Sequence, residues 1–220
     1  YFNYCSSKDS VVTLEDNELW EVGSGTAVIT AKLGDINVQG EVTVEVVATP
    51  PTPAPTPSLP PEDIICLYSD APGYVNHPVD TWAAPWAWAS QEVTDIEIDG
   101  DSAKVYTNMT SFVGIDFSSN VIDASAMTHF HMDIWVPEGN VFKVKLVDFG
   151  EDGAYGGAPD SEHELTFNES STPPIVNKQW ISLDIPLSDF VRLMSTEHLA
   201  QIILSGSTRT IFLDNVYFHK

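Results

Sequence analysis

The sequence predicts an all-β protein in two parts, with a two-sheet sandwich in the longer C-terminal part. Two observations predict this fold class. Short runs of alternating or β-branched residues recur along the chain with turn residues between them, as they do in sandwich proteins. One proline-rich tract, residues 49–61, separates these runs into two groups. We therefore predict a short β domain at residues 1–48, a linker at residues 49–61 and a β-sandwich at residues 62–220.

The first part reads as four strands joined by tight turns. Turn residues lie at positions 16–17, 23–25 and 34–35. The strands are expected at residues 11–14, 19–22, 25–32 and 40–47. The run Gly-Thr-Ala-Val-Ile-Thr-Ala followed by Val-Thr-Val-Glu-Val-Val resembles the second half of a bacterial immunoglobulin-like domain of group 2. The resemblance implies a partial Ig-like sandwich that serves as a spacer or adhesin-type module. Its first strands are missing from the pattern, so this half either pairs with a lost segment or is partly disordered.

The linker reads TPPTPAPTPSLPP. Proline fixes φ near the polyproline II value and has no backbone N–H, so the tract can join neither helix nor sheet. At about 3.1 Å per residue a free tract of this length would hold two bodies roughly 40 Å apart. Pro-Thr spacers of this kind are typical of secreted modular proteins that act on polymeric material.

Residues 62–220 read as a succession of short strands with little helix. The opening strand is expected at residues 64–68. Later strands are expected at residues 92–98, 103–106, 112–117, 129–136, 141–148, 164–167, 180–186, 200–205 and 210–219. Such regular spacing favours two packed sheets.

The order of these strands also carries a family resemblance. Its segments are YSD at 68–70, IDASAM at 122–127, HFHMDIW at 129–135, KVKLVD at 143–148, WISLDIPL at 180–187, LAQIILSG at 199–206 and IFLDNVYF at 211–218. Together they resemble a jelly-roll carbohydrate-binding module of marine Bacteroidota polysaccharide-degrading systems. The resemblance implies a non-catalytic module that binds a polysaccharide, with laminarin-type β-1,3-glucan as the first expectation. It also implies further modules in the full-length protein and a place outside the bacterial cell or on its outer membrane.

Composition limits the classes of partner. The chain has 32 Asp and Glu against 9 Lys and Arg, a formal net charge of −23. Phosphate binding needs a basic surface, so nucleic acid is excluded as a partner and an anionic membrane surface is disfavoured. No apolar run is long enough to span a bilayer. The acidity fits solubility in an extracellular setting, or a supply of calcium ligands. Cys5 and Cys66 lie on opposite sides of the linker and are expected to be free thiols, with Cys66 buried on a strand.

Three tryptophans lie close together in the segment DTWAAPWAWAS. Trp82, Trp86 and Trp88 provide flat apolar surfaces that could stack on the C–H faces of sugar rings. The alternative is that the indoles pack under a loop as part of the core.

The strand at 129–136 alternates sharply. Its apolar residues should face the core, and His129, His131, Asp133 and Trp135 should face outward. On the next strand Lys143 and Lys145 have the same alternation, and we expect them in register on one glycan-binding face. An ordinary solvated face with an Asp–Lys pair is the alternative. The two histidines lack a third ligand nearby for a transition metal.

The segment 148–164 combines glycines with many carboxylates. Tyr155 could stack on a sugar, and Asp148 and His163 could hydrogen-bond its hydroxyls, together with Asp160 and Glu162. The carboxylates could instead bind Ca²⁺, or the segment could be a mobile acidic loop. The resemblance also implies a structural Ca²⁺ that joins the first and last strands, with Asp70 and Asp214 at the matching positions.

These residues leave two alternatives to a glycan-binding module. A glycoside hydrolase or lyase would use Asp148, Glu162 and Glu164, but a pair of carboxylates on one flexible loop is hard to fix across a cleft. In the other alternative the protein is a purely structural or adhesin spacer, and the tryptophans belong to its core. We expect a binder and not an enzyme.

Overall fold

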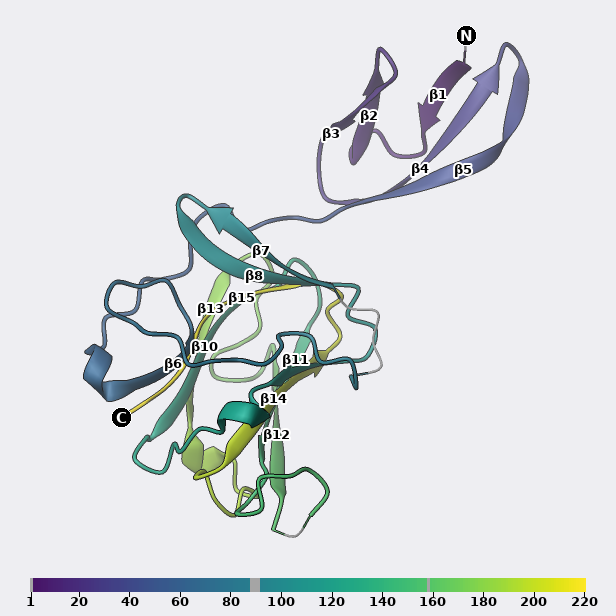
Figure 1. Cartoon of the computed structure of the whole chain (residues 1–220). Helices are drawn as coiled ribbons and strands as arrows, with labels where there is room; N and C mark the ends of the chain where they lie inside the picture. The colour runs from purple at the N-terminus through teal and green to yellow at the C-terminus, as the bar shows by residue number, and fades with distance from the viewer. Residues whose placement is uncertain (1, 88–91, 158) are drawn as a thin grey trace. The chain divides into compact units, whose positions relative to one another are not determined.

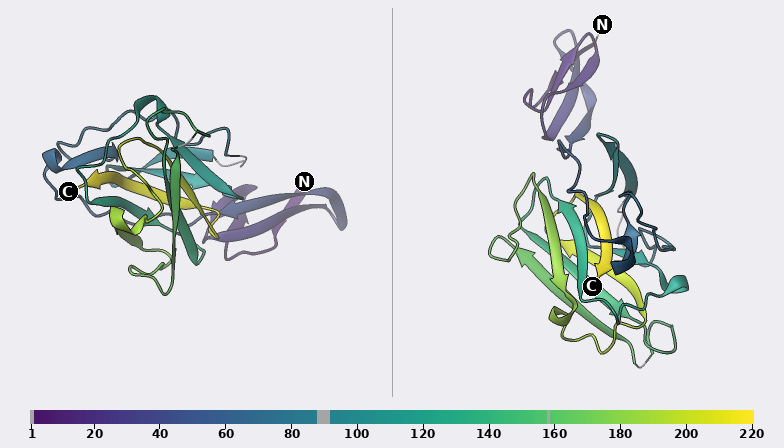
Figure 2. Two further views of the ribbon diagram at one scale, coloured as in Figure 1. Left: turned by 90° about the horizontal axis from the view of Figure 1, so that it is seen from below. Right: turned by 90° about the vertical axis from the view of Figure 1, so that its left-hand side faces the viewer.

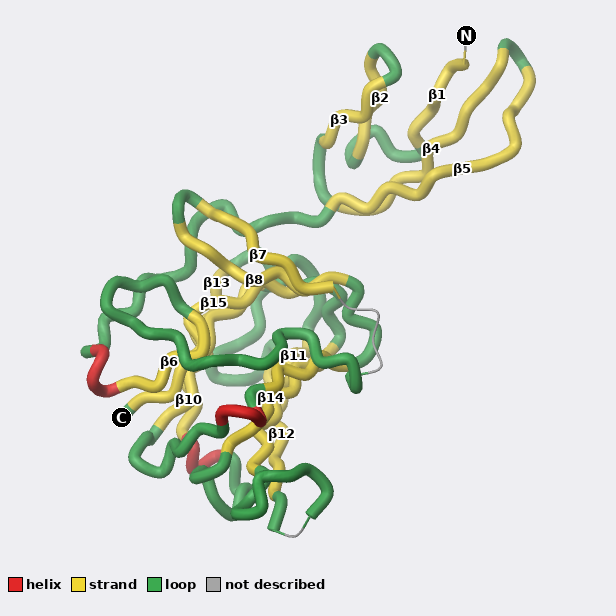
Figure 3. The backbone as a smooth tube through the Cα atoms, in the orientation of Figure 1, coloured by secondary structure: helices red, strands yellow, loops and turns green. Residues whose placement is uncertain are grey.

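The computed structural model describes residues 2–87, 92–157 and 159–220, and these are mostly strands and loops (Figures 1 and 3). Helix in this part of the chain is limited to the single 3₁₀ turns η1 Pro61–Asp63, η2 Ser118–Asn120 and η3 Leu187–Asp189. None of these turns is long or apolar enough to cross a membrane. The chain divides into two compact units, Tyr1–Thr49 and Pro50–Lys220.

The first unit is a small β structure with few buried residues. Its strands are β1 Phe2–Ser6, β2 Val12–Glu15, β3 Glu18–Glu21, β4 Gly25–Leu33 and β5 Ile36–Val46. A sheet of order β1-β4-β5 accompanies the β2–β3 hairpin. Four of these strands match the predicted ones, and β1 was missed because its short run FNYCS has no clear alternation. The buried core comprises Val11, Val12, Ala27 and Ile29.

The second unit is a sandwich of two antiparallel sheets, which confirms the predicted fold class (Figure 2). One sheet has six strands in the order β13-β10-β15-β8-β7, with β6 also paired to β15, and the other has four in the order β12-β11-β14-β9. The strands are β6 Ile64–Tyr68, β7 Glu92–Ile98, β8 Asp101–Thr107, β9 Phe112–Asp116, β10 His129–Trp135, β11 Val141–Asp148, β12 Ser161–Asn168, β13 Trp180–Pro186, β14 Leu199–Gly206 and β15 Ile211–His219.

Strict alternation along the strands builds the core between the sheets. On β11 the side chains of Phe142, Val144 and Leu146 are fully buried, and they belong to the same cluster as Phe130 and Met132 of β10. Each large apolar side chain buried in this way stabilises the fold by about 1.5–3 kcal/mol. The alternate residues of each strand therefore form two outer faces, one on each sheet.

The structure corrects one expectation about these faces. β10 pairs with β13 and β15, whereas β11 pairs with β12 and β14. His131 and Trp135 therefore do not share a face with Lys143 and Lys145. The chain crosses from one sheet to the other between these strands. Alternation shows which side of a strand faces the core, but it does not show which sheet the strand joins.

The proline-rich tract is the second correction. Residues 50–61, called the strap below, belong to the sandwich unit and do not form a free spacer. Pro50 and Ala54 are buried, and the carbonyl oxygens of Thr52 and Pro55 accept hydrogen bonds from sandwich side chains. Prolines donate no backbone hydrogen bond, but their carbonyl groups still accept them, and this allows a proline-rich segment to dock.

Both cysteines are free, as predicted, and Cys66 is buried on β6. Burial raises the pKa of the Cys66 thiol to about 12, so this residue stays protonated as a small apolar side chain.

Candidate functional site

A groove of about 810 Å³ lies on the outer face of the four-stranded sheet. Cross-strand register builds its floor. One row runs from Asp116 on β9 through Gln201 and Val147 to Glu162 on β12. The next row runs through Gly114, Ile203, Lys145 and Glu164. The floor thus combines the apolar side chains of Val147 and Ile203 with polar side chains from all four strands, a mixture common in ligand-binding grooves.

Trp86 forms the wall on the β9 side of the groove. It comes from the long connection between β6 and β7, and 38% of it is exposed. Its six-membered ring lies directly over Gly114, where a Cβ atom would overlap three of the ring carbons. The Phe112 ring lies beside it, with centroids 6.4 Å apart. The absence of a side chain at position 114 therefore lets the indole rest on the sheet with a surface open to the groove.

Asp116 fixes the orientation of this indole. Its Oδ2 accepts hydrogen bonds from Trp86 Nε1 at 3.2 Å and Gln201 Nε2 at 2.8 Å. Its Oδ1 accepts from the backbone N–H and the hydroxyl of Ser118 at 3.0 and 2.6 Å. Burial alone would raise the pKa of Asp116, but these hydrogen bonds outweigh it and lower the pKa below its ordinary value. The carboxylate therefore stays ionised and holds two groups that line the groove.

Two ion pairs form the polar side of this face. Lys145 Nζ lies 2.8 Å from Glu162 Oε1, and Lys143 Nζ lies 2.9 Å from Glu164 Oε1. Lys145, Glu162 and Glu164 line the groove. Each predicted lysine thus finds a glutamate on β12 and not an aspartate on β10. The pairs leave donors and acceptors beside the groove with no excess of positive charge.

Tyr155 lies at the edge of the groove on the loop between β11 and β12. It is 71% exposed, and its ring centroid lies 5.8 Å from that of Phe149. Phe149 packs with Val147, Ala200 and Ile203 in a small apolar cluster apart from the main core. This cluster continues the apolar part of the floor toward the loop.

Two of the other predicted tryptophans do not line the groove. Trp82 is partly buried and packs on the core, with its ring 5.5 Å from that of Tyr68 and 4.7 Å from Lys104 Nζ. Trp135 is 2% exposed and meets Phe212 edge-on. Trp82 therefore packs against the core, as its alternative interpretation has it, whereas Trp135 is buried apart from the main core cluster. Trp88 lies outside the described residues.

Asp148 and His163 are also structural rather than open to a ligand. The buried Asp148 carboxylate accepts the backbone N–H groups of Gly150 at 2.8 Å and His198 at 3.0 Å, which anchors the start of the loop. His163 alternates with Glu162 and Glu164, so it points to the opposite face, where its ring meets Phe190 edge-on. Neither side chain lines the groove.

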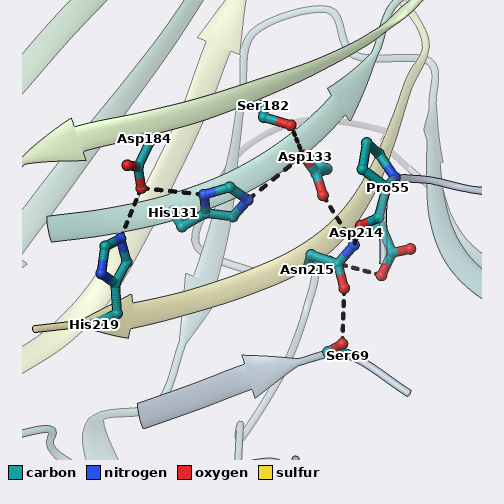
Figure 4. A network of polar contacts seen from close by, with 9 residues as sticks. All are labelled: Pro55, Ser69, His131, Asp133, Ser182, Asp184, Asp214, Asn215 and His219. Atoms are coloured by element: carbon teal, nitrogen blue, oxygen red, sulfur yellow. Dashed lines mark hydrogen bonds and ion pairs between the residues drawn. The ribbon is translucent and has the colours of Figure 1, made fainter. Parts of the chain in front are cut away.

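His131 lies on the outer face of the other sheet, within a polar network (Figure 4). Its Nδ1 lies 3.2 Å from Asp184 and its Nε2 lies 3.5 Å from Asp133, while its ring stacks on Tyr217 at 4.5 Å. Burial opposes charging of the ring, but the hydrogen bonds and negative charges of Asp133 and Asp184 outweigh this and raise the pKa of His131. His219 Nε2 also binds Asp184, at 2.8 Å. The network is a structural feature of this sheet.

The predicted calcium residues lie beside a third carboxylate that sequence reasoning missed. Asp101 interacts with both Asp70 and Asp214. Burial, with the added charge of Asp101, raises the pKa of Asp214 to about 8, and Asp214 Oδ2 is buried with no hydrogen-bond partner. Within the described residues no three acidic, histidine or cysteine side chains converge as a complete metal site. The orphaned carboxylate oxygen nevertheless fits a cation that would take its remaining ligands from backbone carbonyls and water.

The sequence matches no family model and no curated protein. Comparison of folds does find similar structures. A crystal structure of a family 30 carbohydrate-binding module has a TM-score of 0.51 and 15% identity, and the match covers 71% of this chain and 98% of that module. The second unit has the fold of a carbohydrate-binding module.

Two further modules are similar at lower scores. A family 11 module from Clostridium thermocellum, in complex with a β-1,3-1,4-mixed-linked tetrasaccharide, has a TM-score of 0.43 at 15% identity, over 71% of this chain and 95% of that one. A CBM28 module described as specific for non-crystalline cellulose has a TM-score of 0.44 at 17% identity, over 63% and 86%. At these identities the likeness is one of fold, and what this chain binds has to be argued from its own groove.

The sequence contained weak signals for the residues that were missed. Gly114 interrupts a predicted strand, and such a glycine often marks a close approach of another group. Asp116 and Gln201 each occupy an outward position on a predicted strand, but only the pairing of β9 with β14 brings them together. Asp101 follows a turn and gives no local signal.

Proposed function

We propose that the second unit binds a polysaccharide without cleaving it. The observation that carries this proposal is the indole of Trp86, which Gly114 and Asp116 hold exposed at the wall of a groove with both apolar and polar side chains in its floor. A pyranose ring can stack its C–H face on the indole, while Gln201, Lys145 and Glu162 offer hydrogen bonds to its hydroxyls. The fold shared with a carbohydrate-binding module supports the same function.

The positions of the carboxylates favour binding over hydrolysis. The Asp148 carboxylate is fully buried. Glu162 and Glu164 both lie on β12, and each forms an ion pair with a lysine. Asp116 and Glu162 belong to strands three places apart in the sheet, which is roughly 14 Å at the usual strand spacing. Glycosidases need two carboxyl groups about 5–9.5 Å apart.

For the ligand we propose a neutral β-glucan, with laminarin-type β-1,3-glucan first. The lysines near the groove are neutralised by glutamates, and the whole chain carries a formal net charge of −23. An anionic polysaccharide would therefore be repelled rather than attracted. One exposed indole and a few hydrogen bonds support weak binding, of about micromolar to millimolar dissociation constant.

Weak binding is useful when the module is linked to another. We propose that the chain belongs to a larger exported protein of a bacterium of the marine Bacteroidota, outside the cell or on its outer membrane. There it would keep a linked enzyme or glycan-uptake system near its substrate by raising the effective concentration. The polysaccharide is the proposed partner, with the linked modules beside it.

We further propose a structural Ca²⁺ held by Asp101 and Asp214, with Asp70 beside them. A cation there would take the place of the proton that the raised pKa keeps on Asp214 at neutral pH, and would join β15 to the segment that follows β6, so that it links the first and last strands of the sandwich. This ion would support the fold and take no part in glycan binding.

Affinity gel electrophoresis tests the binding proposal with laminarin, mixed-linkage glucan, alginate, agar and xylan in the gels. We expect laminarin, or failing that mixed-linkage glucan, to retard the wild type, and Trp86→Ala to remove the retardation. Trp20→Ala is the matched control, because Trp20 is an exposed tryptophan of the first unit. Retardation that survives Trp86→Ala contradicts the proposed site, and release of reducing sugar contradicts a purely binding role.

A further inference from the structure

The strap lies on the sandwich with a regular pattern of burial. Pro50, Ala54 and, in part, Pro53 and Pro57 are covered, whereas residues 51, 52, 55 and 56 are exposed. A polyproline II helix has three residues per turn, so positions about three apart lie on one side of it. The spacing of the covered positions is therefore that of a polyproline helix with one side against a surface.

The opposing surface offers side-chain donors to the strap at matching intervals. Trp180 Nε1 donates to Thr52 O at 2.8 Å, Asn215 Nδ2 to Pro55 O at 3.2 Å and Tyr74 OH to Leu59 O at 3.0 Å. All three hydrogen bonds thus recognise carbonyl groups of the backbone. Aromatic side chains with donors that bind the carbonyls of an extended proline-rich segment are the general means by which proteins recognise polyproline.

The sandwich itself holds the middle donor in place (Figure 4). The Asn215 side chain accepts from Ser69 Oγ at 2.7 Å and donates to Asp133 Oδ2 at 2.9 Å. Asp133 in turn accepts from Ser182 Oγ. A β-bulge adds one residue to β15 opposite β10, and Asn215 lies at this bulge with φ of 49°. The network orients Asn215 whether or not the strap is present, so the recognition surface is preformed.

We propose that Trp180, Asn215 and Tyr74 form a docking site for a polyproline segment, and that this site takes the strap of a second copy of the chain when its own strap is displaced. The strap fits this site, and every copy of the chain carries it. Because the contacts recognise the backbone and few side chains, the surface does not distinguish its own strap from that of a neighbour. The result is an exchange of identical segments between copies.

Concentration decides between the two arrangements. The net gain from a hydrogen bond in water is small, so the three that bind the strap hold it only weakly. A tethered segment has an effective concentration of roughly millimolar, which favours the chain's own strap in dilute solution. Copies crowded together reach comparable concentrations, and there exchange competes.

The direct test uses a full-length variant in which residues 51–57 are replaced by glycine and serine, which frees the site and keeps both units. The probe is a synthetic peptide of residues 49–60, and the readout is the NMR signal of the Trp180 indole N–H. We expect this signal to move toward its wild-type position with a midpoint of roughly millimolar peptide. Amide dispersion and thermal unfolding of the variant verify that the sandwich is folded.

Two controls make the result specific. A peptide with its prolines changed to glycine should bind at least several-fold more weakly, because it is not preorganised as polyproline II. Tyr74→Phe, which keeps the ring but removes the hydroxyl donor, should weaken binding of the native peptide. An indole signal that does not move in several millimolar peptide, with the variant folded, overturns the docking site.

Exchange between copies has its own measurement. Sedimentation of the wild type up to millimolar protein should detect a dimer that the glycine–serine variant lacks. Wild-type protein that stays monomeric throughout this range overturns the exchange. None of these readouts depends on glycan binding, so they are independent of the proposed function.

Discussion

Gly114 determines where the groove has its aromatic wall. The six-membered ring of Trp86 occupies the space that any other residue's Cβ would need. Asp116 then fixes the rotation of the ring through the indole N–H. A residue with no side chain is thus as important for the site as the aromatic residue itself.

A methyl group at position 114 should displace the indole. We expect Gly114→Ala to weaken glycan binding by about tenfold, which corresponds to about 1.4 kcal/mol, while the unfolding temperature changes little. The backbone there is ordinary extended strand, so alanine brings no conformational strain. Thr166→Ala, on an exposed β12 position outside the groove, is the control, and affinity electrophoresis is the measurement. Unchanged affinity in Gly114→Ala would contradict the role given to Trp86.

His131 carries a pH dependence of stability that can be predicted in sign. The pKa of His131 is raised in the folded protein. Its contribution to the free energy of unfolding is therefore complete below the pKa of the unfolded chain, about 6.5, and is lost as pH rises through the pKa of the folded protein. Partial burial opposes the ionisation of Asp184, but hydrogen bonds from His219 and His131 lower its pKa. Its contribution is therefore lost as pH falls below about 4.

The variant His131→Gln should reveal this window. We expect the difference in unfolding temperature between wild type and variant to be largest at about pH 5–6 and to shrink as pH rises. Thermal unfolding from pH 4 to 9 measures it. A difference that increases toward alkaline pH would show that the charged form of His131 is not the stabilising one.

The loop between β11 and β12 is anchored at its first residue. Asp148 is buried and binds two backbone N–H groups, one within the loop and one in the segment before β14. The loop carries Tyr155 to the edge of the groove, so this anchor connects stability to the site. Sequence reasoning identified the loop but gave Asp148 a role in binding that belongs to structure.

Removal of this anchor should destabilise the sandwich. We expect Asp148→Ala to lower the free energy of unfolding by about 3 kcal/mol, because one buried and one partly buried backbone N–H group lose their acceptor. Asp152→Ala is the matched control, since Asp152 is exposed and accepts one hydrogen bond within the same loop. Urea denaturation measures both. Equal losses in the free energy of unfolding for the two variants would show that Asp148 stabilises the fold no more than an exposed loop aspartate does.

At the scale of the whole sandwich, the two outer faces have different roles. The face of the four-stranded sheet is open and forms the groove, whereas the strap contacts the other face. The buried Asp214 carboxyl group interacts with Asp101 near the strap. A cation bound there should therefore affect the stability of the whole unit and not the groove.

Calcium should raise the unfolding temperature of the second unit. At a free concentration 100 times the dissociation constant the gain is about 2.7 kcal/mol, or roughly 5–10 °C for a domain of this size. Calorimetry with Ca²⁺ and with a chelator measures this shift. In Asp214→Asn the shift should vanish, and the calcium-free variant should lose no stability, because Asp214 Oδ2 has no partner to lose. An equal shift in the variant would place the ion elsewhere.

The sequence by itself determined the strands, their inward and outward residues and the β-sandwich class. Strand propensity and alternation are local properties, so residues 92–98, 141–148 and 180–186 were predicted with the bounds they have. Only the tertiary structure decided which sheet each strand joins, and hence that Lys145 faces Glu162 and not Asp133. It also decided that the Trp86 indole is exposed to the groove while Trp135 is buried, and that the proline-rich tract packs on the sandwich. These outcomes depend on contacts between residues far apart in the chain, and no short window of sequence records them.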